Sequence, residues 1–347
     1  MPFARSYFNA TLYKKYLTRF WPIWALYAII WFFILPVNLV LNGSMGDYGT
    51  YAAAARFANE EVLRMLPEFG LGMGVLFGLL CAMAIWSYLY NNRSAGFMHA
   101  LPIRREGLFF TGFLAGATFF IVPNAVVFLI TLGVEAKAGA VNLSVLALWF
   151  AVQSMYCLFF FCFATICGFV TGHILALPAF YFIFNFLSIG IYSLVENVLR
   201  NFVYGFHAIT GALPVANKLS PLYNISKVIR VSTERVNGVT TNVTLRGVPT
   251  LVTYTVVGLV LAALALLLYR RHQAEQAGEV VTAAWLRPVF KYGVAFCGAL
   301  AFGSLLYEIF IEALWGSAWG MLGFLLLCGF LSYLVAEMLL QKSFRVL

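Results

Sequence analysis

Residues 108–133, LFFTGFLAGATFFIVPNAVVFLITLG, decide the fold class because they run for 26 positions without a charged side chain. A helix needs about 20 apolar residues to cross the ~30 Å hydrocarbon core of a bilayer. Backbone groups in lipid must find hydrogen-bond partners within the chain, and barrel strands are short and alternate in polarity. We therefore expect this stretch to form a transmembrane helix.

The remainder of the chain has the same character. Hydrophobic residues make up 63% of the 347 positions and charged residues 10%, against about a quarter charged in soluble domains. The sequence predicts an all-α polytopic membrane protein with about eight transmembrane helices. The other seven expected spans are 20–41, 69–90, 145–169, 173–194, 251–269, 290–312 and 314–338. Only Ala313 separates the last two, so the number eight depends on a tight turn there.

The distribution of basic residues predicts the orientation. The net charge of +9 sits in short runs beside apolar segments, which indicates membrane topology and not nucleic-acid binding. If the N-terminus is cytoplasmic, inner segments hold 13 of the 22 basic residues, and six of the other nine lie in the long segment 195–250. The positive-inside rule counts for less in long segments, which leaves 13 against 3. We expect both termini inside.

We expect one transmembrane domain over residues 1–347, with small segments outside the bilayer. Residues 1–19 mix aromatic and basic side chains and predict a helix in the inner headgroup layer. Residues 42–68 form an outer cap with charges at helical spacing. Residues 91–107 and 270–289 form a cytoplasmic loop and a cytoplasmic connector.

Residues 195–250, between the fifth and sixth helices, are the one sizeable extracytoplasmic segment. We expect its first half to lie on or in the outer leaflet. Its second half is rich in Thr and Val around Asn237 and Gly238. Asn-Gly between strand-forming residues is a strong turn signal and predicts a short β-hairpin.

Catalytic motifs are absent from the sequence. It has no His-Glu-x-x-His, no Gly-x-Ser-x-Gly and no phosphate-binding loop. We therefore expect no enzyme activity, no catalytic residue and no cofactor bound by this chain. The four histidines are scattered, so we expect no metal site.

For the polar side chains within the spans, the sequence leaves two alternative roles open. Glu308 and Glu312 share a helix face near the outer end of the seventh span, where they interact with interfacial water or contact an ion or substrate. Asn124, Gln153 and Asn185 form interhelical hydrogen bonds or line a translocation path.

Glycines at four-residue spacing predict close helix packing, either within the chain or at a subunit interface. These residues are Gly70, Gly74, Gly78, Gly112 and Gly116.

The loop 91–107 carries the most informative cytoplasmic sequence. It is apolar at Phe97, Met98 and Leu101, is interrupted by Pro102 and then turns basic. A short apolar-faced helix there would dock in a groove of a soluble motor. The alternative is an interfacial turn carrying positive-inside charges.

A family resemblance favours the docking helix over the interfacial turn. The stretch Tyr88-Leu-Tyr-Asn-Asn-Arg93 through Phe97-Met-His-Ala-Leu-Pro-Ile-Arg-Arg-Glu106 resembles a loop of ABC-2-like multi-span ABC transporter permeases of Gram-positive bacteria. Tyr269-Arg-Arg-His-Gln-Ala-Glu-Gln-Ala-Gly278 is similar to an inner connector of that family, and Leu339-Leu-Gln-Lys-Ser-Phe-Arg-Val346 to its tail. Leu219-Ser-Pro-Leu222 is similar to an outer segment of ABC-2 proteins. Many members continue past this tail, which leaves open whether a C-terminal region is missing after Leu347.

The resemblance implies a permease subunit in the bacterial cell membrane. It implies a separate cytoplasmic ATPase that binds ATP and Mg, and a second permease subunit, identical or different. The residues implied to contact the ATPase are Arg93, Phe97, Met98, His99, Leu101, Pro102, Arg104, Arg105 and Glu106. A second cytoplasmic contact is implied at Arg270, Arg271 and Glu275.

Two other functions stay open at this point: an ion-coupled secondary transporter, and a membrane scaffold or sensor that transports nothing. A secondary transporter should show carboxylates at mid-membrane or paired broken helices. The sequence encodes neither substrate nor direction legibly, although its 34 Phe residues agree with an amphipathic substrate.

Overall fold

The computed structural model describes residues 8–42, 51–100, 102–139, 141–206, 213–236, 239–271, 286–310 and 318–341. These residues include eight helices that are long and apolar enough to cross a membrane, so the chain is a multi-pass helical membrane protein. The spans are Trp21–Leu41, Ala55–Tyr90, Arg105–Lys137, Leu143–Val170, Ala176–Phe202, Val248–Arg270, Arg287–Phe310 and Trp319–Gln341. Each overlaps one of the eight expected spans.

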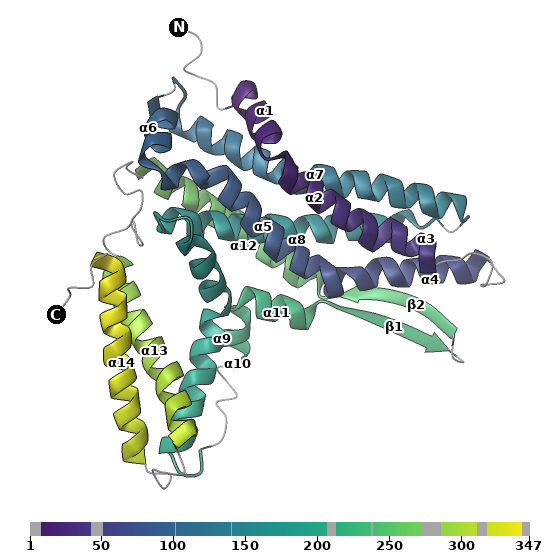
Figure 1. Cartoon of the computed structure of the whole chain (residues 1–347). Helices are drawn as coiled ribbons and strands as arrows, with labels where there is room; N and C mark the ends of the chain where they lie inside the picture. Colours follow the sequence, from purple (N-terminus) through teal and green to yellow (C-terminus); the bar gives the residue numbers. More distant parts are fainter. Residues whose placement is uncertain are drawn as a thin grey trace. The chain divides into compact units, whose positions relative to one another are not determined.

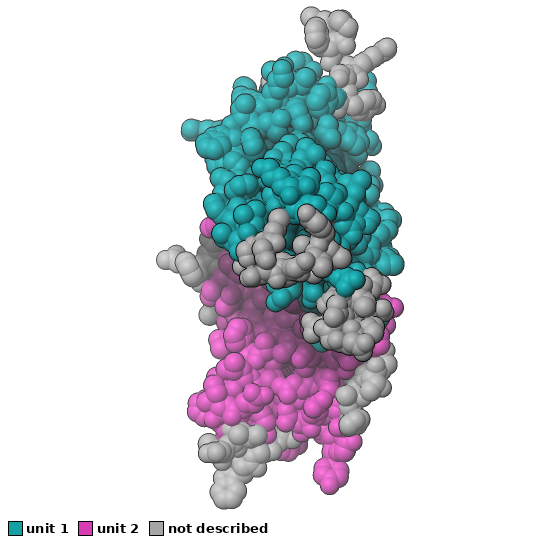
Figure 2. Space-filling model, turned by 90° about the vertical axis from the view of Figure 1, so that its right-hand side faces the viewer, with its two compact units in different colours: residues 1–169, 225–275 teal, residues 170–224, 276–347 magenta. Residues whose placement is uncertain are grey.

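Contacts divide the chain into two compact units (Figure 2). The first comprises Met1–Phe169 and Ile225–Glu275, and the second Val170–Asn224 and Gln276–Leu347. We describe each unit by itself, and the single transmembrane domain stays a prediction.

The first unit begins with α1 (Ala10–Arg19), whose N-cap Asn9 accepts a hydrogen bond from the backbone N–H of Leu12 at 3.0 Å. After Phe20 the chain continues as α2 (Trp21–Phe32), the π-turn η2 (Phe33–Val37) and α3 (Asn38–Asn42). Pro36 lies inside η2, and proline removes a helix hydrogen bond, which accounts for the irregular turn. The expected N-terminal helix is therefore present, and its depth in the headgroup layer stays a prediction.

The second span is longer than expected. It runs without a break through α4 (Tyr51–Met65), η3 (Leu66–Gly70), α5 (Leu71–Trp86) and η4 (Ser87–Tyr90). The expected cap at 42–68 is thus not a separate element, because its described part continues into the span. Arg64 in α4 forms an ion pair with Glu68 at 2.6 Å, one helical turn further on.

The expected β-hairpin is confirmed. Strands β1 (Arg230–Val236) and β2 (Val239–Arg246) pair antiparallel, with Arg230 opposite Arg246. The turn residues Asn237 and Gly238 lie outside the described residues. Both strands contact α4 (Figure 1). Gly247, which links β2 to α12 (Val248–Arg271), has φ +90, and a Cβ there would lie 2.5 Å from the carbonyl oxygen of Val228, the last residue of α11 (Pro221–Val228).

The core of the first unit forms around α8 (Leu143–Val170), which packs with α5, α7 (Arg105–Lys137) and α12 (Val248–Arg271). A Cβ on Gly74 would lie 2.8 Å from the Cβ of Tyr156, and one on Gly78 would lie 2.9 Å from the backbone of Phe160. On α7, a Cβ on Gly116 would lie 2.4 Å from the ring of Phe161. The glycines thus let the helices of this chain approach one another closely.

The other two predicted packing glycines also make close contacts. A Cβ on Gly70 would lie 2.6 Å from Oε1 of Gln153. A Cβ on Gly112 would lie 3.1 Å from a methyl group of Ile85.

The second unit comprises α9 (Ala176–Phe202), α10 (Leu213–Lys218), α13 (Leu286–Phe310) and α14 (Ala318–Gln341). α9 continues as one helix eight residues beyond the expected end of the fifth span at 194. The long helices α13 and α14 pack side by side (Figure 1), and an ion pair between Lys291 and Glu337 joins them. The turn around Ala313 lies outside the described residues.

The glycine contact between α5 and α8 gives a stability prediction. In Gly78→Ala the new methyl group would meet backbone atoms of α8 at 2.9 Å, so the two helices must separate. We expect a loss of about 1 to 3 kcal/mol, seen as a lower melting temperature in detergent. Gly72→Ala on the same helix is the matched control, because a Cβ there meets nothing within 4 Å. Equal melting temperatures for the two variants would contradict the packing described.

Candidate functional site

The predicted coupling loop contains a short helix, α6 (Asn92–Ala100), between the second and third spans. Asn91 starts it, because its side-chain oxygen accepts from the backbone N–H of Arg93 at 3.0 Å and its carbonyl accepts from Ala95. Pro102 is the second residue after Ala100, where the helix ends, and α7 begins at Arg105. The described part of the loop therefore contains a short helix and not only an irregular turn.

The surface of α6 combines an anchored face with an exposed one. Ala95 is completely buried, whereas Phe97 is 63% exposed. Arg93, Pro102, Arg104 and Arg105 are also exposed, and Met98 and Glu106 are half-buried. Of the other predicted contact residues, Leu101 lies outside the described residues, as does the side chain of His99.

The structure brings together the two predicted cytoplasmic contacts. Glu106 at the start of α7 forms an ion pair with Arg270 at the end of α12, with 2.6 Å between Oε1 and Nη2. The guanidinium of Arg105 donates to the carbonyl oxygen of Arg270 at 3.1 Å. Two spans far apart in the sequence are thus joined at the base of α6. Arg271 ends α12, its side chain is not described, and Glu275 lies outside the described residues.

An aromatic cluster supports this junction from within the unit. The ring of Trp86 lies 5.2 Å from Phe109, 4.9 Å from Phe169 and 6.2 Å from Tyr269, measured between centroids. The hydroxyl of Tyr88 donates to that of Tyr269 at 3.0 Å. These contacts connect the ends of five helical segments, α5, η4, α7, α8 and α12.

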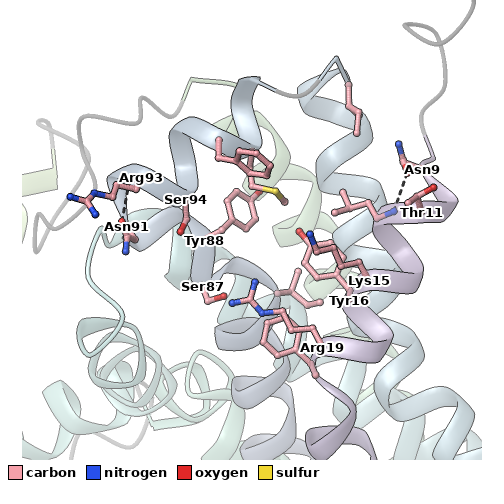
Figure 3. A pocket seen from close by; sticks show the side chains of 16 residues that line it. Asn9, Thr11, Lys15, Tyr16, Arg19, Ser87, Tyr88, Asn91, Arg93 and Ser94 are labelled. Carbon is pink, nitrogen blue, oxygen red and sulfur yellow. Dashed lines mark hydrogen bonds between the residues drawn. The ribbon is translucent and has the colours of Figure 1, made fainter.

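A hollow of about 680 Å³ opens between α1 and α6 (Figure 3). Lys15 and Arg19 of α1 lie on one side of it, and Tyr88 and Ser94 lie across from them. Tyr16 is buried in the wall beside Arg19, and burial raises the pKa of its phenol well above the usual range. The phenol therefore stays neutral and does not offset the cations.

The candidate pathway residues of the first unit hydrogen-bond to one another. Tyr27 donates to Asn124 at 2.8 Å, and the amide of Gln153 donates to Tyr27 at 3.1 Å. Asn124 also donates to Ser154 at 3.2 Å. The side chains of Tyr27, Asn124 and Gln153 are at most 1% exposed, so this network joins α2, α7 and α8 by interhelical hydrogen bonds.

The candidate pathway residues of the second unit lie apart from such a network. Asn185 is buried, and its amide donates to the carbonyl of Tyr181 one turn earlier in α9. Glu308 is exposed, and Glu312 lies outside the described residues.

Several residues of these regions were not predicted as site residues. The sequence assigns the cations of the hollow, Lys15 and Arg19, to membrane topology and to the N-terminal interfacial helix, and Tyr88 to a resemblance, but none of them to a site. A spacing of four residues between the two cations was the available signal, since it places them on one helix face. Glu135 near the end of α7 is also buried, and its Oε2 accepts from the backbone N–H of Asn142 at 3.2 Å. Nothing local in the sequence predicts that burial.

Removing a member of the buried network tests its structural role. In Asn124→Ala the hydroxyl of Tyr27 loses its oxygen acceptor in a buried site, with only the weak acceptor Cys157 Sγ left at 3.3 Å, which we expect to cost about 1 to 2 kcal/mol. The melting temperature in detergent should fall accordingly. Asn201→Ala is the control, because Asn201 is exposed and bonds only the backbone of its own helix. Matching melting temperatures for the two variants would argue against a structural network.

Comparison with known proteins gives no family for this chain. No protein-family model, no curated protein and no solved structure matches the chain. Among the described residues, no group of three or more His, Cys, Asp or Glu side chains is placed to hold a metal ion. The fold class is that of a multi-pass α-helical membrane protein.

Proposed function

We propose that this chain is the permease subunit of an ATP-driven ABC transporter in a bacterial cell membrane. A separate ATPase subunit would supply ATP hydrolysis, and a second permease subunit would complete the translocation unit. The observation that carries the proposal is α6, a short helix with Phe97 63% exposed, attached to the ends of two membrane-spanning helices.

An exposed aromatic residue on a short helix suits docking into a groove of a soluble partner. Such grooves take the apolar face of a helix as their main contact, and large aromatic side chains act as anchors. Arg104 and Arg105 beside α6 add positive charge for an acidic rim. Phe97 is a large apolar side chain that is mostly exposed beside the junction, and docking in that groove would bury it.

The junction gives such docking a mechanical effect. A displacement of α6 acts on α7 through the short link at 102–104 and on α12 through Arg270. The ring cluster around Trp86 makes this end of the unit stiff, since its members are at most 9% exposed. Motion at α6 is therefore passed to the spans as a rigid displacement and is not absorbed in a flexible loop.

An ion-coupled secondary transporter is less well supported. The buried polar residues Asn124 and Gln153 are engaged with Tyr27, and Glu308 is exposed. Coupling ions need unengaged carboxylates or broken helices at mid-membrane. The described part of the first unit offers neither at this network.

The proposal predicts that Phe97→Asp disrupts a complex with an ABC ATPase. The test co-expresses the full chain with the ABC ATPase encoded beside its gene and measures complex formation by size-exclusion chromatography. A buried charge at an anchor position should weaken the complex at least about 30-fold, or about 2 kcal/mol. The ATPase rate stimulated by the permease in nanodiscs should fall with it.

Leu219→Asp is the matched control for this variant. Leu219 is 64% exposed and lies in the segment expected outside the cell, so the same change should leave the complex intact. Equal complex formation by both variants, or proton-driven transport by the isolated chain, would contradict the proposed function.

A further inference from the structure

The hollow between α1 and α6 carries a net positive charge. Its lining includes Lys15, Arg19 and Arg93 and no Asp or Glu. Within the described part of the chain, none of these three cations forms an ion pair. The guanidinium of Arg19 lies over the ring of Phe20, 5.4 Å from its centroid, and Figure 3 shows it directed toward the hollow. Its charge is therefore available to an anion.

The hollow lies level with the ends of two membrane spans. Arg19 ends α1 two residues before the first span begins at Trp21, and η4 ends the second span at Tyr90. Lipid phosphates occupy this level of a bilayer, and basic pockets between the cytoplasmic ends of helices are suited to anionic headgroups. A volume of about 680 Å³ is in the range of small-molecule sites.

Apolar surface continues from this level along the first span. Leu26, Ile29 and Phe33 are 51%, 53% and 61% exposed, and their spacing places them on one helix face. Phe20, Ile85, Phe97 and Met98 line the hollow itself. A ligand with a charged head and hydrocarbon chains could cover the hollow and the apolar face of the first span, whereas an acidic peptide held in the hollow would leave that face uncovered.

We infer that the hollow between α1 and α6 binds the headgroup of an anionic phospholipid, with Lys15 and Arg19 holding its phosphate. The lack of a carboxylate in the lining favours a headgroup without an ammonium group. Ser94 and Tyr88, across from the two cations, bound the space for the remainder of the head (Figure 3). The bound lipid would bridge α1 and α6, and this inference does not depend on the proposed transport function.

Native mass spectrometry of the full chain tests the inference. The detergent-solubilised protein is titrated with phosphatidylglycerol and with phosphatidylcholine of the same acyl chains. We expect phosphatidylglycerol to bind at least tenfold more tightly. In Lys15→Gln/Arg19→Gln its affinity should fall about 30-fold, from roughly a fivefold loss per charge, while phosphatidylcholine binding stays unchanged.

Lys14→Gln/Arg287→Gln is the matched control, because it removes the same charge from exposed positions outside the hollow. The control should retain phosphatidylglycerol affinity within a few-fold of the unmodified chain. An equal loss in both variants, or equal affinity for the two lipids, would overturn the inference.

Two further measurements distinguish other ligands. Soluble glycerol phosphate should not displace the lipid at comparable concentration, and displacement would assign the site to a free phosphate compound. If Lys15→Gln/Arg19→Gln kept its lipid affinity but lost binding to the ATPase, the hollow would be a protein contact and the lipid site would be refuted.

Discussion

The first unit depends on the close approach of α8 to its neighbours. Gly74 and Gly78 bring α5 against the backbone of α8, and Gly116 of α7 accommodates the ring of Phe161. In lipid there is little hydrophobic force between helices, so stability comes from such close packing and from hydrogen bonds between helices. The network of Tyr27, Asn124 and Gln153 is buried among these packed helices. The same contacts position the helices whose ends form the junction of Glu106 with Arg270.

Packing contacts and interhelical hydrogen bonds constrain the helices in different ways. Ring and glycine contacts fix the distance between α5, α7 and α8 but leave the surfaces of α2 and α12 exposed at many apolar residues. Hydrogen bonds then fix the rotation of individual helices, since Tyr27 can reach Asn124 in only one orientation of α2. At the junction, Tyr88 and Tyr269 do the same for η4 and α12. These spans of the first unit are thus held both laterally and in rotation.

Much of the fold could be predicted from composition, because a bilayer forces long apolar runs into helices. The eight spans and the β-hairpin followed from that constraint and from the Asn-Gly turn signal. The ends of the elements did not, since residues 55–68 continue a span as a helix despite their charges. A helix at the membrane surface and the end of a membrane span have similar composition, so composition alone does not distinguish them. In the structure this segment belongs to a continuous helix that packs against β1 and β2.

The candidate site was predictable in part. The sequence of α6 and the basic residues beside it indicated a cytoplasmic contact, but the pairing of Glu106 with Arg270 depends on tertiary structure. The buried position of Tyr269 and the hollow beside α1 likewise arise from elements far apart in the chain. The residue pattern within one segment does not predict contacts between segments that are far apart in the chain.

The second span has a mechanical consequence because of its length. Its 36 residues form a helical run of about 54 Å at 1.5 Å per residue, well beyond the ~30 Å of hydrocarbon. One end contacts the β-hairpin and the other leads into α6, while Gly74 and Gly78 press its middle against α8 (Figure 1). A long rod held near its centre behaves as a lever about a fulcrum. A tilt about the glycine contacts would move the hairpin end and the α6 end of this span in opposite directions.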